Sequence, residues 1–403
     1  MWFFRFEQSN MCNRNLYNID MKNIYLLLVI IVLLGCKETP ISNMDIRECV
    51  INVNKSQEKL DISNLFTDEL GVVPLETTEE CLISDMLKVQ FTNDYIYVSD
   101  QVAQCIFQFS SSGKFVRSIG HRGESPIDYS SIGDFIVTDN YIYIQDLYKN
   151  KILCYDLNGI FLEAFSLEDI GIDEMINLGN NVLYCVSNYR NYKNGCFNLY
   201  KLDLLTRKMK GLIPADAKVA EKQSAWGLNR YSSKNGNSAL IIYPLNDTIY
   251  SLVNDSVMPE MIVRFSERSL PESMRYQYVM ETMEQSSDYI LGMNNIKNTD
   301  KYIFFEYGDG AMHKNAILNK ERLSSETTDR FVLEKWGGLY ISNFETRNNE
   351  FYLIQPAYFF KKSWNAIYSR ENFKNEDYRR LFEKLYNGLH DDDNPIIFKL
   401  YMK

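Results

Sequence analysis

The sequence lacks the short motifs by which many enzymes and nucleotide-binding proteins are recognised. No Gly-x-Ser-x-Gly segment marks a serine nucleophile, and no Walker or dinucleotide-type glycine pattern marks a phosphate-binding loop. Histidine is scarce: the chain has only His121, His313 and His390, so histidine-based catalysis has few candidates. Hydrolase and nucleotide-binding functions therefore have no positive support in the sequence.

Basic clusters are missing as well. The chain carries 43 lysines and arginines against 53 aspartates and glutamates, which gives a formal net charge of -10. An acidic chain without a basic patch or stripe has no electrostatic footprint for DNA or RNA. We therefore exclude nucleic acid as a partner.

The eight cysteines lack metal-site spacing, because no CxxC and no Cys/His pair at ligand spacing occurs. No metal is therefore expected from them. Cys105 and Cys154 lie inside apolar strand patterns, where an unpaired thiol acts as a small buried hydrophobe. Cys185 and Cys196 flank a predicted hairpin and face each other only in a suitable register, so the sequence leaves open whether they form a disulfide.

The eleven uncharged residues from Ile24 to Leu34 are too few to span a bilayer, which takes roughly 20 apolar residues. They follow a short basic start and precede Gly35 and Cys36, which is the layout of a signal peptide. The run ending at Gly35-Cys36 resembles a bacterial lipobox. That resemblance implies cleavage between Gly35 and Cys36 and lipidation of Cys36. The alternatives are an ordinary secretion signal and a buried strand.

This layout divides the chain into four parts. We interpret residues 1–20 as an over-extended start, 21–35 as a lipoprotein signal peptide, 36–55 as a lipid-anchored N-terminal tether, and 56–403 as the folded domain. The lipid makes the membrane one expected partner. The expected location is the cell envelope, as an outer-membrane lipoprotein on the periplasmic face or at the cell surface.

Strand patterns dominate the rest of the chain, and two segments are nearly identical. TNDYIYVSD at residues 92–100 recurs as TDNYIYIQD at residues 138–146. In the second repeat, turn signals separate four short runs rich in β-branched and aromatic residues, at 132–137, 141–146, 151–156 and 160–166. A repeated four-stranded antiparallel unit of this length predicts the blades of a β-propeller.

Four less regular blades follow, so the sequence predicts an all-β, six-bladed propeller of four-stranded antiparallel blades. Their predicted strands are 181–187 with 197–203, then 239–243, 248–252 and 261–265, then 302–307 with 315–318, and finally 338–342 with 351–355. Because an open ring exposes strand edges, the terminal strands at 396–401 and 72–76 are expected to pair and close it. Two short helical insertions, one at about 271–283 and one ending at Gly388, interrupt the β pattern.

Several of these segments carry a family resemblance. Residues 142–146, 151–152, 155–156 and 159 are similar to an NHL/TolB-like propeller repeat, while PLETT (74–78), NDTIYSL (246–252) and NPIIFKL (394–400) resemble the six-bladed β-propeller lipoproteins of Bacteroidetes. The resemblance covers most of residues 45–403. It implies an envelope location and a binding or scaffolding role, without an established reaction. This chain departs from the family at residues 124–129, where a Gly-Pro-Gly-Glu-Tyr-like loop is usual.

A ligand face follows from the NHL-type topology, in which the loop after the second strand and the connection into the next blade lie on one side of the disc. For the first two blades, the residues expected on this face are Gln101, His121, Arg122, Glu124, Tyr129, Tyr148 and Lys149. Their mix of bases, acids and aromatics suits a polar or glycan ligand. The alternative is an ordinary solvated rim.

Asp100 and Asp146 end their strands at equivalent positions of the repeat. A carboxylate that recurs in this way most simply caps the backbone amides of the following loop, and a metal ring is the alternative. The leading functional hypothesis is thus a lipid-anchored envelope propeller that binds a protein or glycan, with no cofactor and no evident catalysis. The second hypothesis is a propeller lyase or hydrolase that holds a divalent cation such as Ca²⁺ in its channel.

Overall fold

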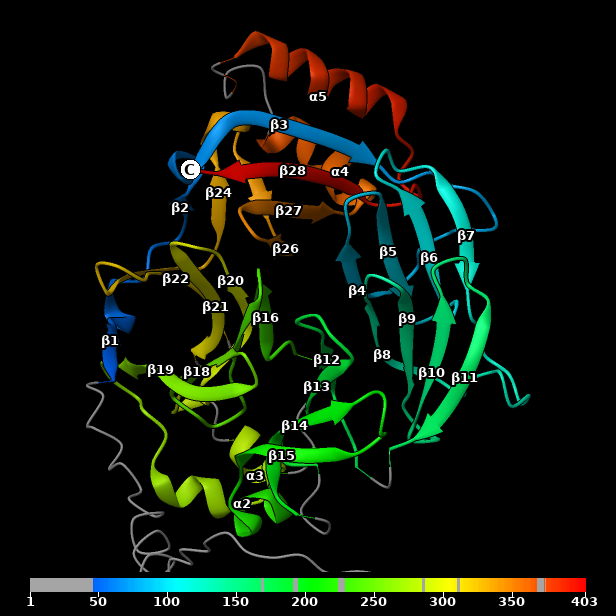
Figure 1. Ribbon diagram of the computed structural model, residues 1–403. Coiled ribbons are helices and arrows are strands. Elements are labelled where there is room, and N and C mark those ends of the chain that lie inside the picture. The colour runs from blue at the N-terminus through cyan, green and yellow to red at the C-terminus, as the bar shows by residue number, and fades with distance from the viewer. Residues whose placement is uncertain are drawn as a thin grey trace, which may run out of the picture. The chain divides into compact units, whose positions relative to one another are not determined.

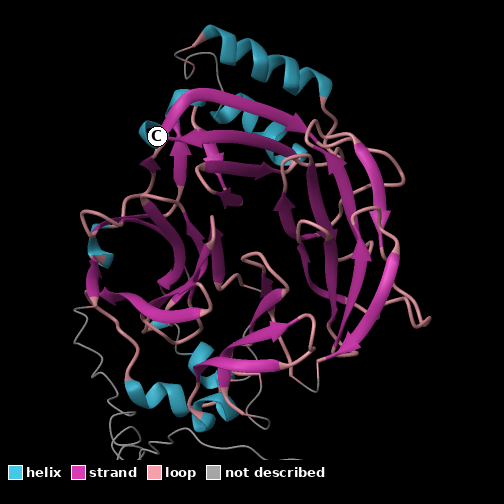
Figure 2. Ribbon diagram, viewed as in Figure 1, coloured by secondary structure: helices cyan, strands magenta, loops and turns pink. Residues whose placement is uncertain are grey.

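The computed structural model describes residues 46–167, 170–190, 195–223, 229–284, 287–309, 312–367, 373 and 375–403. These residues form seven sheets arranged as the blades of a propeller, with few helices (Figures 1 and 2). The predicted signal peptide, its cleavage site and the lipidated Cys36 lie outside the described residues. No helix among the described residues is long and apolar enough to cross a membrane.

The two repeats identified in the sequence form the first two blades, and the predicted strands are confirmed. The first blade contains β4 (Met86–Phe91), β5 (Tyr95–Asp100), β6 (Cys105–Ser110) and β7 (Phe115–Ile119). The second contains β8 (Ile132–Val137), β9 (Tyr141–Asp146), β10 (Lys151–Asp156) and β11 (Phe161–Ser166). The recurring YIY segment is the second strand of each blade, with side chains alternating between the two faces of the sheet.

Three further blades continue the ring. They consist of β12 (Glu174–Ile176), β13 (Val182–Val186), β14 (Phe197–Asp203) and β15 (Met209–Pro214); β16 (Ser232–Asn235), β17 (Ser238–Ile241), β18 (Thr248–Val253) and β19 (Ser256–Phe265); and β20 (Met293–Asn298), β21 (Tyr302–Asp309), β22 (Met312–Asn319) and β23 (Ser324–Thr328). Six of the seven sheets contribute an inner strand to the axis, and these strands contact one another in the order β4, β8, β12, β16, β20, β26 and back to β4.

The prediction of six blades is wrong, because the segment assigned to the sixth blade divides between two sheets. One is a three-stranded sheet of β2 (Leu60–Asp61), β24 (Phe331–Leu333) and β25 (Leu339–Ile341). The other contains β26 (Phe344–Arg347), β27 (Glu350–Gln355), β28 (Ile396–Met402) and β3 (Phe66–Pro74). Strands of two or three residues show no readable alternation, and β2 comes from a distant part of the chain, so the extra sheet left no clear pattern in the sequence.

Ring closure by the two ends of the folded unit is confirmed. Strand β28 lies between β27 and β3, and the register places Ile396 opposite Pro74 and Phe398 opposite Val72. The buried side chain of Asn394 adds hydrogen bonds just before β28. Its amide donates to the carbonyls of Glu76 at 2.7 Å and Cys81 at 2.8 Å. The segment before β28 is thereby hydrogen-bonded to the residues that follow β3, in addition to the pairing of the two strands.

Residues 47–74, which we call the edge segment, run along the edges of four successive sheets (Figure 1, blue). Strand β1 (Arg47–Ile51) pairs in parallel with β19, and Gln57 then forms a parallel bridge to Thr328 at the end of β23. A short 3-10 turn at Val53–Lys55 precedes Gln57. Strand β2 then pairs with β24, and after a second 3-10 turn at Ser63–Leu65, β3 pairs with β28. The predicted tether, 36–55, therefore includes a strand of the folded unit.

The described residues contain four α-helices. The predicted first insertion is a 3-10 helix, Glu272–Tyr276, followed by α3 (Val279–Glu284), and α2 (Ala217–Lys222) contacts the 3-10 helix. The predicted second insertion is α5 (Glu376–Gly388), preceded by α4 (Ala357–Ile367). Helices α4 and α5 pack on the closing blade, where the rings of Phe360 and Phe382 lie 6.0 and 5.5 Å from the ring of Phe398. A further 3-10 turn, Glu334–Trp336, places Trp336 in the same core.

Replacing Phe398 by alanine should lower the free energy of unfolding by about 3–5 kcal/mol, because a fully buried ring is removed from the junction of β28 with both helices. Urea denaturation followed by circular dichroism measures the effect. The control is Val116→Ala on the outer strand β7, where Val116 is 37% exposed and a change within about 0.5 kcal/mol is expected. Equal unfolding midpoints for the two variants would show that β28 is not a core strand.

Candidate functional site

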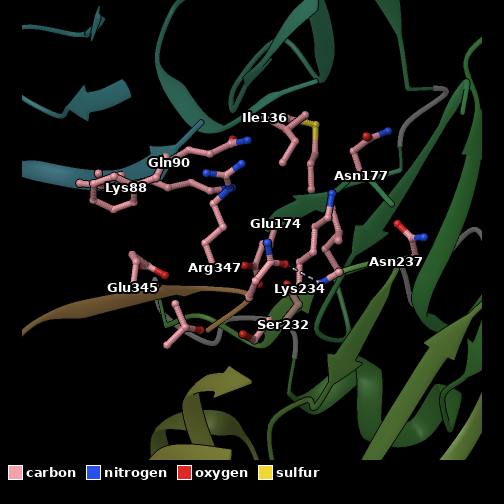
Figure 3. A pocket seen from close by; sticks show the side chains of 18 residues that line it. Lys88, Gln90, Ile136, Glu174, Asn177, Ser232, Lys234, Asn237, Glu345 and Arg347 are labelled. Carbon is pink, nitrogen blue, oxygen red and sulfur yellow. Dashed lines mark hydrogen bonds between the residues drawn. The ribbon is translucent and has the colours of Figure 1, made fainter. Parts of the chain in front are cut away.

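The channel along the propeller axis holds two cavities that meet at its centre. One has a volume of about 390 Å³ and the other about 350 Å³, and both are lined by Lys88, Val89 and Glu345. The smaller cavity reaches the residues at or before the beginnings of β4, β20 and β26, and we call it the N-mouth. The larger extends to the ends of β4, β16 and β26, and we call it the C-mouth (Figure 3).

A buried ion cluster joins the inner strands at the channel. The carboxylate of Asp134 on β8 is fully buried and lies 2.8 and 3.0 Å from the ammonium nitrogen of Lys88 on β4. The guanidinium of Arg230, just before β16, donates to the same carboxylate at 3.2 Å and to the carbonyl of Leu87 at 3.0 Å. The backbone amide of Met175 on β12 also donates to the Asp134 carboxylate, at 2.6 Å. Four blades thus meet at one carboxylate.

Two more carboxylates of the channel have protein partners. Glu345 on β26 accepts two hydrogen bonds of 2.8 Å from Lys297 on β20. Glu174 is buried and accepts from the amide of Tyr231 at 3.0 Å. Burial raises the pKa of Glu174, although Arg230 and Lys88 act in the opposite direction. Burial also opposes the charge of Arg230, but Asp134, Glu174 and Glu345 outweigh it and raise the pKa of that guanidinium.

Irregularities in the inner strands position these charges. The pairing register shifts between Met86 and Lys88, between Ile132 and Asp134, and between Asn294 and Lys297. Such bulges change the direction in which a side chain points and are common beside functional sites. At Gly133 a Cβ atom would lie 2.8 Å from the side-chain oxygen of Gln145, so a larger residue in this bulge would require Gln145 to move.

The sequence analysis missed this cluster, although a signal was present. Lys88 and Asp134 occupy equivalent positions of the two clear repeats, inside the otherwise apolar runs MLKVQF and IGDFIV. A charge in the middle of an apolar inner strand is costly unless it is paired, and opposite charges at equivalent repeat positions indicate pairing between neighbouring blades. The contribution of Arg230 had no comparable signal, because it precedes its strand.

Of the residues predicted for the ligand face, six are exposed and one is buried. Six of the seven are exposed on loops at the side of the N-mouth: Gln101, His121, Arg122, Glu124, Tyr148 and Lys149. Gln101 and Tyr148, from neighbouring blades, also line a third cavity of about 260 Å³. This side cavity shares Leu87 with the N-mouth.

Tyr129 does not belong to this surface, and its placement there was wrong. Its side chain is fully buried, and its hydroxyl donates to the carbonyl of Gln104 at 2.7 Å. Burial raises the pKa of Tyr129 above the usual tyrosine range. The ring packs beneath its own loop because the backbone bridges Arg122 to Tyr129 and turns the ring toward Gly120. On the outside of the loop, His121 Nε2 lies 2.8 Å from Asp128 Oδ1.

Asp100 and Asp146 cap loops, as the repeat predicted. Asp100 accepts from the amides of Ser84 and Asp85, each at 2.7 Å, and from two amides of the loop that follows β5. Asp146 accepts from the amides of Ser130, Tyr148 and Lys149. Burial alone would raise the pKa of Asp146, but these hydrogen bonds lower it. Both carboxylates therefore hold loop backbone in place.

The side cavity contains one group that titrates near neutral pH. Burial raises the pKa of Asp173 to about 6, although Arg190 forms an ion pair with it and acts to lower the value. Both side chains line the cavity with Gln101 and Tyr148. A group with this pKa changes charge between mildly acidic and neutral conditions.

The described cysteines are packing residues. Cys105, Cys154 and Cys185 are buried, and burial raises their pKa values to about 11, 11 and 12. Thiols with such values stay protonated and are poor nucleophiles. Cys185 and Cys196 form no disulfide, because the register places Cys185 opposite Tyr200 and Cys196 precedes β14.

The alternative hypothesis of a channel-bound cation gains no support from this geometry. Within the described ranges, no group of three or more histidines, cysteines, aspartates and glutamates is placed to hold a metal ion. Asp134 and Glu345 are instead partnered by lysine and arginine, as shown above. A divalent cation at either carboxylate would have to compete with these charges.

Replacing Asp134 by alanine should cost about 3–5 kcal/mol of stability, because Lys88 and Arg230 would be left in the channel wall without their carboxylate. Thermal and urea unfolding measure the loss. Asp139→Ala is the matched control, since Asp139 is exposed in the next turn and its removal should change stability by no more than about 0.5 kcal/mol. Comparable losses for both variants would contradict a structural role for the cluster.

Comparison with solved structures supports the propeller fold. A putative exported protein of Bacteroides fragilis NCTC 9343 matches with a TM-score of 0.70 and 19% identity over 88% of this chain and 99% of that chain. A DUF4221 family member from Bacteroides vulgatus ATCC 8482 matches with a TM-score of 0.48 and 9% identity over 83% and 96%. The virginiamycin B lyase of Staphylococcus aureus matches with 0.39 and 10% over 70% and 80%. Only the first of these shows a shared fold, and the other two carry no argument.

No curated protein matches the chain. A family model described as a domain of unknown function, DUF4934, matches residues 48–401, which is nearly all of the folded unit. This match replaces the expected family of six-bladed lipoproteins with a coarser assignment that specifies neither a lipid anchor nor a ligand. The chain belongs to the DUF4934 family.

Proposed function

We propose that this chain is a lipid-anchored β-propeller of the cell envelope that binds a protein or glycan partner and catalyses no reaction. The propeller fold, and the exposed polar loops of which two line the side cavity, support the binding role. The signal-peptide layout ending at Gly35-Cys36 supports the anchor. The similar Bacteroides fragilis protein is described as exported, which agrees with that location.

The binding role rests mainly on Tyr148. Its side chain is 77% exposed and lies at the side cavity together with Gln101, Asp173 and Arg190. An aromatic ring beside a concave polar surface supplies a large contact area once a partner covers it, and tyrosine is enriched among the residues that dominate binding energy. The neighbouring Lys149 and the loop with His121, Arg122 and Glu124 add charges of both signs.

The loop that carries Tyr148 is held in place before any partner arrives. Asp146 accepts from the amides of Tyr148 and Lys149 at 3.2 and 3.1 Å and from Ser130 of the preceding connection. On the same face, Lys151 donates to the carbonyl of Asp128 at 2.9 Å and so fixes the adjacent loop to β10. Less conformational entropy is lost on binding when the contact residues are already ordered.

Replacing Cys36 by serine should release the protein from the membrane fraction and abolish fatty-acid labelling, because serine offers no thiol for the lipid. Fractionation and metabolic labelling with a palmitate analogue measure both effects. A Cys196→Ser variant is the control, because it removes a half-buried thiol of the folded unit, and it should keep the wild-type distribution. Membrane retention by the Cys36 variant, together with an unlabelled wild type, would refute the anchor.

Combined alanine changes at Arg122, Glu124 and Tyr148 should weaken partner retention by about tenfold or more, since rim charges and aromatics are each worth around 1 kcal/mol when a partner desolvates them. Retention is measured with the immobilised full-length protein, incubated with solubilised envelope extract and, separately, with a panel of purified polysaccharides.

The matched control changes exposed residues on the opposite turns, Ser112, Leu205 and Lys208. Leu205, at 75% exposed, matches Tyr148 in exposure and belongs to the turn between β14 and β15. Both variants should melt like the wild type. Equal retention by the two sets, or a loss confined to the opposite turns, would overturn the assignment of the binding face.

A further inference from the structure

The C-mouth contains a pair of cations that no carboxylate neutralises fully. Lys234 on β16 and Arg347 on β26 both line this cavity of about 390 Å³ (Figure 3). The backbone of Lys234 pairs with Ala239 in the sheet, but within the described part of the chain no hydrogen bond or ion pair joins its side chain to another residue. Lys234 is exposed, yet partial loss of hydration beside the cavity wall and repulsion from Arg347 lower the pKa of its ammonium group, and Asp139 is the carboxylate that acts against this shift.

The guanidinium of Arg347 is also only weakly compensated. One of its nitrogens donates to the side-chain oxygen of Asn93 at 2.6 Å, and another lies 3.7 Å from Glu350. Glu350 is engaged more closely by Lys399, at 2.5 Å, and by the hydroxyl of Tyr352. Glu350 is therefore shared among Arg347, Lys399 and Tyr352, and it neutralises the charge of Arg347 only in part.

The two carboxylates that line the C-mouth do not balance these cations. Glu345 receives both of its short hydrogen bonds from Lys297. Glu174 faces Arg230 and Lys88, and its raised pKa disfavours the charged form. Lys234 and Arg347 thus give the cavity a local positive potential in a chain whose formal net charge is -10. This potential attracts an anion.

The remaining lining is suited to a ligand that is hydroxylated and not merely charged. The side chains of Asn237 and Ser232 make no hydrogen bond within the described residues. Asn348 accepts from the amide of Gly236 at 3.2 Å through its oxygen and keeps its amide group for another acceptor. Ile136 and Ile176 supply an apolar wall. Amide and hydroxyl groups beside an apolar wall match the hydroxyls and C–H faces of a sugar ring.

We propose that the C-mouth binds a sugar acid, with its carboxylate between Lys234 and Arg347 and its hydroxyls on Asn237, Asn348 and Ser232. The planar guanidinium suits a carboxylate, and the cavity falls within the size of small-molecule sites, roughly 300–1,000 Å³. The sugar acid is either a free monosaccharide or the end residue of a glycan. This site lies at the other end of the channel from the proposed partner surface and is independent of it.

Isothermal titration calorimetry with the full-length protein tests the proposal. The probes are D-galacturonate, D-glucuronate, digalacturonate, the neutral sugars D-galactose and D-glucose, and acetate. At least one acid sugar should bind, and its neutral counterpart and acetate should each bind at least about tenfold more weakly, because each lacks one half of the recognised chemistry. Binding of digalacturonate alone would identify the end of a glycan as the source, whereas binding of the monosaccharides would identify the free acid.

Lys234→Ala and Arg347→Ala should each weaken the binding by about tenfold or more, and the double variant should abolish it. Lys208→Ala is the control, because Lys208 is exposed on a turn outside the cavity. All four proteins should have the same melting temperature. The proposal is overturned if no acid sugar binds at roughly 10 mM, if a neutral sugar or acetate binds equally well, or if the double variant binds like the wild type.

Discussion

The pairing of sheet edges is the constraint on which this structure depends. A ring of separate sheets leaves an outer edge on each blade, with unpaired amides and carbonyls that invite association with other chains. Here residues 47–74 lie along the edges of four successive sheets, first in parallel with β19 and finally antiparallel to β28. The same segment therefore covers exposed edges and closes the ring. Four of the seven blades are thereby held at their outer margins.

At the axis, neighbouring blades are connected by ionic contacts between side chains, whereas at the outer margin they are connected by backbone hydrogen bonds between strand edges. Asp134 on β8 connects β4, β12 and the segment before β16, so four blades are held by a single buried carboxylate. Burying charge is expensive, and paired charges inside a protein seldom add much net stability. Their value here is positional: the contacts fix where the blades meet, and they leave Lys234 and Arg347 as the charges available to a ligand.

Local patterns in the sequence predicted local structure well. Tyr95–Asp100 and Tyr141–Asp146 form the predicted second strands, and Asp100 and Asp146 cap the predicted loops, because alternation and loop capping depend on residues close together in the chain. The failures involve distant contacts. The three-stranded sheet requires residues 60–61 to meet residues 331–333, and the buried Tyr129 reaches the carbonyl of Gln104 in the preceding blade. The channel charges depend on bulges, which periodicity does not reveal.

The edge segment also sets the order in which this protein can fold. Its strands come early in the chain, yet β3 pairs with β28, which is made after all the other strands of the propeller. Strands β1 and β2 pair with segments more than 200 residues away. During synthesis from the N-terminus, β4 to β15 can form sheets from neighbouring strands, while residues 47–74 remain without their partners. The ring can close only after Ile396–Met402 has emerged. Until then the nascent chain exposes unpaired strands, so it needs protection from aggregation until β28 is available for pairing.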